Sequence, residues 1–205
     1  NDELMQSTLK WFREGPPAKV YRYDSDCWQI PSLYHEMSSC EPVYSWNVFH
    51  SWQLGDREKF LEGMYSLFAG MVSRQTYTAC ETRGGITGLT GAMLPTYLAR
   101  LALVDDQIGE GELHLLRLTP LAWLREDKEL RFEKAPTEFG PVSLSAKLAN
   151  GGRTLEVSFE PWFRVKPKRV VLHIPPLTRL EQVMLNGKTL EWNRREAYLI
   201  ISKGL

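Results

Sequence analysis

Apolar residues recur every three or four positions in the first half of the chain and alternate with polar residues in the second half. The helical spacing is clearest at residues 56–73, where it predicts an amphipathic helix with Asp56 as its N-terminal cap. A second helix is predicted from about Thr90 to about Asp105, since Pro95 is tolerated in a first turn. Residues 4–13 carry a shorter helical pattern.

From Glu112 onward the period of the pattern falls to two, which indicates strands. The predicted strands are residues 112–118, 129–133, 142–148, 154–159, 169–174, 180–185 and 197–202. Asn150-Gly151-Gly152 and Asn186-Gly187 predict hairpin turns, because these residue types tolerate positive φ. The predicted fold class is therefore α+β, with a helical part at residues 1–110 and an antiparallel β-sandwich at residues 111–205.

Residues 24–53 follow neither period and are rich in aromatic side chains. A long irregular segment in a compact domain is usually a functional loop or disordered, and one with this many aromatic rings is poorly suited to disorder. We predict that the segment forms ordered loop and short helix that line a site.

The composition argues against two classes of binding partner, nucleic acid and membrane. Of the 205 residues, 25 are Lys or Arg and 25 are Asp or Glu, so the formal net charge is zero. No nucleic acid and no membrane partner is predicted, because neither a basic patch nor an apolar run of about 18 residues is present. Three cysteines are an odd number, which argues against a disulfide framework and leaves the compartment open, cytoplasmic or exported. The chain begins at Asn1 within an amphipathic segment and has no signal peptide, so we expect a piece of a longer protein.

A candidate catalytic loop connects the two predicted helices. Residues 76–85 carry Glu81 and Arg83 among hydroxyls, an aromatic ring and two glycines. Helices on either side would fix the position of a carboxylate while the loop leaves it open to substrate. The alternative is a surface ion pair between Glu81 and Arg83.

The chemistry that best suits these residues is carbohydrate chemistry. Hydrolysis of a glycosidic bond needs paired carboxylates, and the helical half supplies Asp24, Asp26, Glu36, Glu41 and Glu81. Aromatic rings offer flat apolar faces to sugars, although each tryptophan taken singly is equally explained as core. Glu81 is therefore a candidate catalytic carboxylate, and Trp46, His50, Trp52, Tyr77 and Arg83 are candidate substrate-binding residues.

Other chemistries fit less well. Cys27, His35, Cys40 and His50 match no familiar zinc spacing. A nucleophilic Cys80 would need a base that the spacing does not supply, and residues 83–85 lack the pattern of a phosphate loop. Neither a metal nor a cofactor is predicted.

Two segments together resemble a known family. Residues 78–83, Thr-Ala-Cys-Glu-Thr-Arg, are followed by an amphipathic helix and resemble the Thr-Thr-x-Trp-Glu-x-Trp segment of bacterial α-L-rhamnosidase-like glycoside hydrolases. Residues 135–143, Ala-Pro-Thr-Glu-Phe-Gly-Pro-Val-Ser, with residues 155–157 and 170–175 after them, are similar to the C-terminal β-sandwich of the same enzymes. Residues 113–123 resemble the crossing between the two parts, and the three segments follow the family order.

The resemblance implies both an architecture and a mechanism. These enzymes have an (α/α)6 toroid before the sandwich, so residues 1–110 would be the last part of a toroid and the chain's partner would be the rest of it. Glu81 would be the general base of an inverting mechanism on an oligosaccharide or glycoside, while the general acid belongs to an earlier part of the toroid. Cys80 and Thr82 stand where the family usually has tryptophans.

Three functions are therefore open. The chain is the C-terminal portion of a glycoside hydrolase-like protein acting on plant or bacterial polysaccharides, inactive by itself; or it is a non-catalytic carbohydrate-binding module that uses the aromatic residues 28–52; or it is a structural accessory domain. The first predicts little or no glycosidase activity for this chain by itself. The second predicts binding that survives that substitution and depends on a tryptophan.

Overall fold

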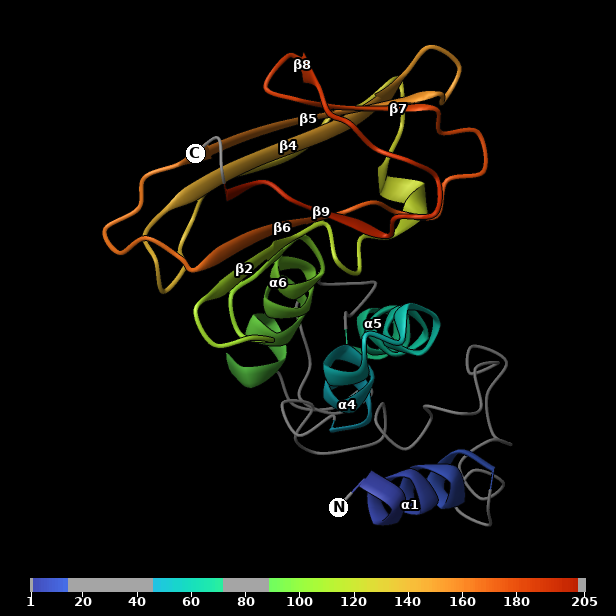
Figure 1. Cartoon of the computed structure of the whole chain (residues 1–205). Helices are drawn as coiled ribbons and strands as arrows, with labels where there is room; N and C mark the ends of the chain where they lie inside the picture. Colours follow the sequence, from blue (N-terminus) through green and yellow to red (C-terminus); the bar gives the residue numbers. More distant parts are fainter. Residues whose placement is uncertain (1, 15–45, 72–88, 203–205) are drawn as a thin grey trace. The chain divides into compact units, whose positions relative to one another are not determined.

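A computed structural model describes residues 2–14, 46–71 and 89–202, and these ranges contain both helices and strands. The chain divides into two compact units, Asn1–Leu98 and Ala99–Leu205. Figure 1 shows helices in the first unit and sheets in the second. The fold class α+β that the sequence predicts is confirmed at this level.

Four α-helices are described; three of them agree with the helical spacing of the sequence, whereas α4 lies in the aromatic segment for which loop and short helix were predicted. They are α1 (Asp2–Glu14), α4 (Trp46–Leu54), α5 (Arg57–Met71) and α6 (Leu89–Leu103). Asp56 caps α5 as predicted, because its Oδ1 accepts a hydrogen bond of 3.0 Å from the amide of Lys59. The helix α6 starts one residue before the predicted Thr90, but Pro95 is its seventh residue and so lies beyond the first turn in which the prediction placed it.

Helices α4 and α5 pack against each other through large apolar side chains. Val48 on α4 and Phe60 and Met64 on α5 are fully buried. Gly55, with φ of +70°, ends α4, and Asp56 then begins the next helix. The pair is therefore a helical hairpin with a two-residue connection, in which burial of the apolar faces supplies most of the stabilisation.

The strands of the second unit form two sheets. A four-stranded sheet has the order β1 (Val104–Asp105), β2 (Glu112–Leu115), β6 (Arg169–His173) and β9 (Tyr198–Ile200). A five-stranded sheet has the order β3 (Leu130–Ala135), β4 (Val142–Ala149), β5 (Thr154–Pro161), β7 (Gln182–Leu185) and β8 (Lys188–Thr189). A 3-10 helix, η3 (Leu121–Trp123), lies between β2 and β3. Each of the seven predicted strands overlaps one of these strands.

One hydrophobic core joins the two sheets, which Figure 1 shows as two layers. Leu113, Leu115 and Leu172 come from the four-stranded sheet, and Leu155 and Phe159 come from the five-stranded sheet. All five are at most 1% exposed. Because side chains alternate along a strand, the residues between them point outward and leave a polar outer face on β4 and β5.

Two of the strand pairings are parallel, which the sequence pattern did not predict. Strand β2 pairs with β6 in parallel, and β5 pairs with β7 in the same way, whereas the other five pairings are antiparallel. A parallel pair needs a long crossover connection. Here the crossover passes through the other sheet: the chain runs through β3, β4 and β5 between β2 and β6. The two sheets are thus linked by the chain as well as by the core.

Both hairpin turns that the sequence predicts are present. Asn150 and Gly151 have φ of +56° and +71° between β4 and β5, and Asn186 and Gly187 have +49° and +77° between β7 and β8. Positive φ at both central residues is the signature of the turn whose twist matches that of an antiparallel pair. These local signals therefore set the register of two hairpins.

Candidate functional site

The residues predicted to act on a sugar are described only in part. Tyr77, Glu81 and Arg83 lie outside the described residues, and so does the side chain of Trp46, the first residue of α4. The positions of these four side chains relative to one another are therefore not part of the structure described here. Their roles remain predictions.

His50 and Trp52 are both buried within the helical unit. His50 is 9% exposed and Trp52 is 8% exposed, and the intervening Phe49 packs against the ring of Tyr97 with ring centres 6.0 Å apart. Residues two apart on a helix point in different directions, so α4 is covered on more than one side. Trp52 packs as core here, and a sugar-stacking role for its ring remains a prediction.

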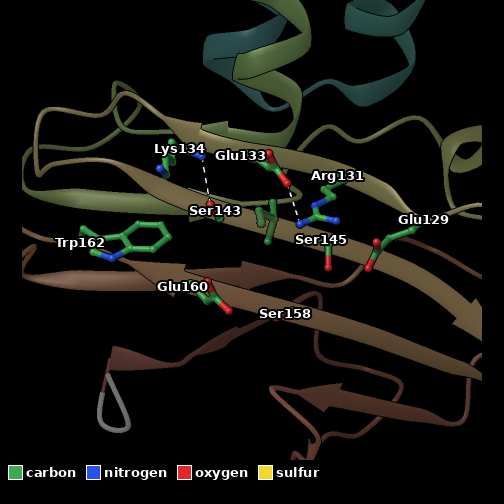
Figure 2. Close-up of a pocket in the computed structure, with 10 residues that line it drawn as sticks. Glu129, Arg131, Glu133, Lys134, Ser143, Ser145, Ser158, Glu160 and Trp162 are labelled. Carbon is green, nitrogen blue, oxygen red and sulfur yellow. Dashed lines mark hydrogen bonds and ion pairs between the residues drawn. The ribbon is translucent and has the colours of Figure 1, made fainter.

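A shallow groove lies on the outer face of the five-stranded sheet, away from the core (Figure 2). Its volume is about 440 Å³. The floor consists of serines: Ser143 and Ser145 on β4, and Ser158 on β5, directly opposite Ser145. These side chains are short, so the sheet surface is lower here than at the longer residues on either side.

The walls of the groove carry charged groups and one exposed aromatic ring. Arg131 on β3 pairs with Ser145 in register, and its guanidinium forms an ion pair of 2.6 Å with Glu133. Trp162 lies at one end of the groove and Glu129 at the other, as Figure 2 shows. Trp162 is 47% exposed, so a face of its ring is open to a ligand.

A bulge in β3 places two consecutive residues on the same groove. The pairing of β3 with β4 shifts between Phe132 and Ala135, and Lys134 has φ of +48°. Consecutive residues of a regular strand point to opposite faces, yet Glu133 and Lys134 both line the groove. The amide of Lys134 donates a hydrogen bond of 3.0 Å to the hydroxyl of Ser143, which holds the bulge to the floor.

A second concavity of about 300 Å³ continues the groove across the sheet. It shares Glu129, Ser145 and Ser158 with the first and extends to Met184 and Asn186 at the β7–β8 turn. The outer face therefore carries one elongated depression rather than an isolated pocket.

None of the residues that line this groove is among the site residues predicted from the sequence. A usable signal was present, since Ser143, Ser145 and Ser158 occupy outward positions of predicted strands where long polar residues are more usual. The bulge at Lys134 left no comparable signal, because a non-glycine residue with positive φ cannot be recognised from its type alone.

A chain of polar contacts occupies the outer face of the four-stranded sheet. His114 Nε2 lies 3.0 Å from a carboxylate oxygen of Glu112, and His114 Nδ1 lies 2.8 Å from Nε2 of His173. Because an ionised carboxylate only accepts, Nε2 of His114 donates to Glu112, and one further hydrogen bond joins the two histidine rings. Arg169 also donates to Glu112, with Nε 2.8 Å from Oε1. These contacts link β2 to β6 across their parallel pairing.

The contacts of Glu112 change the pKa of its carboxylate. Hydrogen bonds from Arg169, and to a smaller extent from His114, hold the pKa of Glu112 below its ordinary value of 4.5, while burial acts in the opposite direction. A folded-state pKa below the unfolded value stabilises the fold above the unfolded pKa. That stabilisation is lost as the pH falls through the folded pKa.

We expect Glu112→Gln to reduce the acid sensitivity of folding. At neutral pH the variant should be less stable than the wild type, and the difference should shrink as the pH falls below 4.5. The effect should be modest, because the Arg169 side chain is 52% exposed and solvent screens the pair. Urea unfolding at a series of pH values measures it, with Glu110→Gln, whose side chain is 97% exposed, as the control. Equal pH dependence in wild type and Glu112→Gln would contradict the assignment.

The described ranges contain neither a metal cluster nor a membrane-spanning helix. Within residues 2–14, 46–71 and 89–202, no group of three or more His, Cys, Asp or Glu side chains is placed to hold a metal ion. In the same residues no helix has the length and apolar character that a membrane crossing requires. Comparison of the chain with protein-family models, curated proteins and solved structures finds no match.

Proposed function

We propose that the chain is the C-terminal portion of a glycoside hydrolase-like protein that acts on plant or bacterial polysaccharides. The observation that carries the proposal is the order of elements around Glu81. Helix α5 ends at Met71, helix α6 begins at Leu89, and a unit of two sheets follows directly. This order is that of the toroid end and β-sandwich of α-L-rhamnosidase-like enzymes, so the helices are proposed as a toroid remnant and the sheets as the sandwich.

Glu81 would act as the general base of this reaction. In an inverting mechanism, one carboxylate takes a proton from water as the water attacks the anomeric carbon, and a carboxylic acid on the other side of the bond protonates the leaving oxygen. The sequence segment that resembles the family supplies the base. The acid would come from residues that precede this chain in the longer protein, so the chain by itself is expected to be inactive.

The decisive experiment uses a protein extended at the N-terminus to include the preceding helices. We expect it to hydrolyse aryl glycosides, and we expect Glu81→Gln to lower kcat by roughly 100-fold or more with little change in KM, because a base acts mainly in the transition state. Glu110→Gln is the matched control, since it removes an exposed carboxylate that lies in another segment.

The outcome also separates the alternatives. If the extended protein hydrolyses no glycoside, the catalytic proposal is wrong, and sugar binding that survives Glu81→Gln then favours a carbohydrate-binding module. If neither hydrolysis nor binding is found, the structural accessory role is favoured. The described residues offer one observation toward sugar binding, the groove that ends at Trp162.

A further inference from the structure

We propose that the groove on the outer face of β3, β4 and β5 binds a neutral oligosaccharide. This site is built entirely from residues of the second unit and includes none of the residues predicted to form the catalytic sugar site. The inference goes beyond the proposed catalytic function and does not depend on it.

The first argument is that the concavity is built by the choice of side chains. Long polar residues usually cover the solvent face of a sheet, yet three serines form the floor here, and their longer neighbours form the walls. The resulting volume of about 440 Å³ is within the range of small-molecule sites in proteins. A solvated face with no ligand has no need of such a depression.

The second argument is the bulge in β3. It turns Glu133 and Lys134 to the same side and holds Lys134 at φ of +48°, a conformation that costs a non-glycine residue on the order of 1 kcal/mol. Bulges and strained residues occur preferentially where a strand must re-aim a side chain at a site. Here both re-aimed side chains line the groove.

The third argument is the chemistry of the lining. Sugar rings present apolar C–H faces together with many hydroxyls, so they need an exposed aromatic ring beside hydrogen-bonding groups. Trp162 supplies the ring. Within the described part of the chain, the side chains of Ser145, Ser158, Glu129 and Glu160 have no hydrogen bond or ion pair, so they are available to hydroxyls.

Charge favours a neutral ligand over an anion. The groove carries three carboxylates, on Glu129, Glu133 and Glu160, against two cations, on Arg131 and Lys134. The groove therefore has a net negative charge of one unit, and the guanidinium of Arg131 already contacts Glu133. Phosphate, nucleic acid and acidic glycans would meet net repulsion.

An added peptide strand does not fit this location. Strand addition requires the free edge of a sheet, where backbone N–H and C=O groups are unpaired. The groove floor is the face of β4 and β5, and each of these strands has a hydrogen-bonded neighbour on both sides. The continuation toward Asn186 instead suits an elongated ligand that crosses the strands, which is the shape of an oligosaccharide.

The test is binding of neutral oligosaccharides to the whole chain, first on a glycan array and then by calorimetry with each positive glycan. Trp162→Ala should weaken binding roughly tenfold or more, because ring stacking is lost, and Trp162→Phe should restore part of it. Ser145→Trp should also weaken binding, because it fills the floor. Tyr198→Ala removes an exposed aromatic ring from the other sheet and should bind as the wild type does.

The proposal is wrong if no neutral glycan binds at millimolar concentration, or if neither Trp162→Ala nor Ser145→Trp alters the binding. Preferential binding of acidic glycans or basic peptides would also overturn it. Glu81→Gln should leave this binding unchanged, so failure of the groove and failure of the catalytic base are observed separately. Hydrogen exchange in β4 and β5 verifies that each variant is folded.

Discussion

Gly140→Ala should destabilise the second unit by about 3–4 kcal/mol, more than an exposed glycine position normally allows. Gly140 has φ of +125°, a region that side chains with a Cβ rarely adopt. An added Cβ would overlap the carbonyl oxygen of Trp162 and lie 3.0 Å from the amide nitrogen of Arg164. Both neighbours are backbone atoms, so neither can move aside by changing a rotamer. The substitution combines backbone strain with overpacking.

The neighbours of Gly140 are held in place by their own contacts. The amide of Trp162 donates a hydrogen bond of 2.9 Å to the carbonyl of Pro141, and the amide of Arg164 donates one of 2.7 Å to the carbonyl of Phe139. The ring of Phe163 packs against Phe139, with ring centres 6.5 Å apart. Relief of the overlap would therefore break contacts that fix the start of β4 against the end of β5.

Gly151→Ala is the matched control for Gly140→Ala. Gly151 also has positive φ, at +71°, but an added Cβ would meet nothing within 4 Å. Its cost should be limited to the backbone term of about 1–2 kcal/mol. Urea unfolding, followed by hydrogen exchange of amides in β4 and β5, measures both variants in this unit. Equal destabilisation of the two would show that the close approach to Trp162 is unimportant.

Much of the fold could be predicted because its signals are local. Asp56 caps α5 through a hydrogen bond three residues away, and the turns at Asn150 and Asn186 depend on residues that tolerate positive φ. Strand positions follow from alternation, which needs only the neighbouring residues. The structure also supplies a physical reason for the glycine at position 140, since a Cβ there would overlap the backbone of Trp162.

Features that depend on distant residues could not be predicted in the same way. The parallel pairing of β2 with β6 joins Leu113 to Val170, and no local pattern states which strands become neighbours. The groove requires Ser145 and Ser158 to lie opposite each other and Trp162 to end the same face. For the predicted sugar site, the aromatic pattern indicated Trp52 without indicating burial, because an aromatic residue serves a core and a sugar platform equally well.

A buried ion pair joins the end of α6 to the segment before Gly140. Arg100 Nη2 donates to Oδ1 of Asp106 at 2.8 Å and to the carbonyl of Pro136 at 2.9 Å. The other oxygen of Asp106 accepts from the amide of Glu138 at 2.7 Å. The side chains of Arg100 and Asp106 are 13% and 5% exposed. A single carboxylate therefore satisfies a cation and a backbone amide that water does not reach freely.

Asp106→Ala should lower the free energy of unfolding of the second unit by about 3–5 kcal/mol, because it leaves a buried guanidinium without its counter-charge and an amide without its acceptor. Within the described residues Nη1 of Arg100 already lacks a hydrogen-bond partner, and the neutral carbonyl of Pro136, which Nη2 would keep, does not replace the lost counter-charge. Arg100→Met combined with Asp106→Ala should cost less than Asp106→Ala alone, since the unpaired charge is then absent.

Asp127→Ala, which breaks the exposed pair with Arg125, should leave stability close to that of the wild type. Urea unfolding with hydrogen exchange in β4 measures all three variants. If Asp127→Ala destabilised the unit as much as Asp106→Ala, burial would not explain the importance of the Arg100–Asp106 pair. If the double variant were less stable than Asp106→Ala, the unpaired charge of Arg100 would not be the cause of the destabilisation.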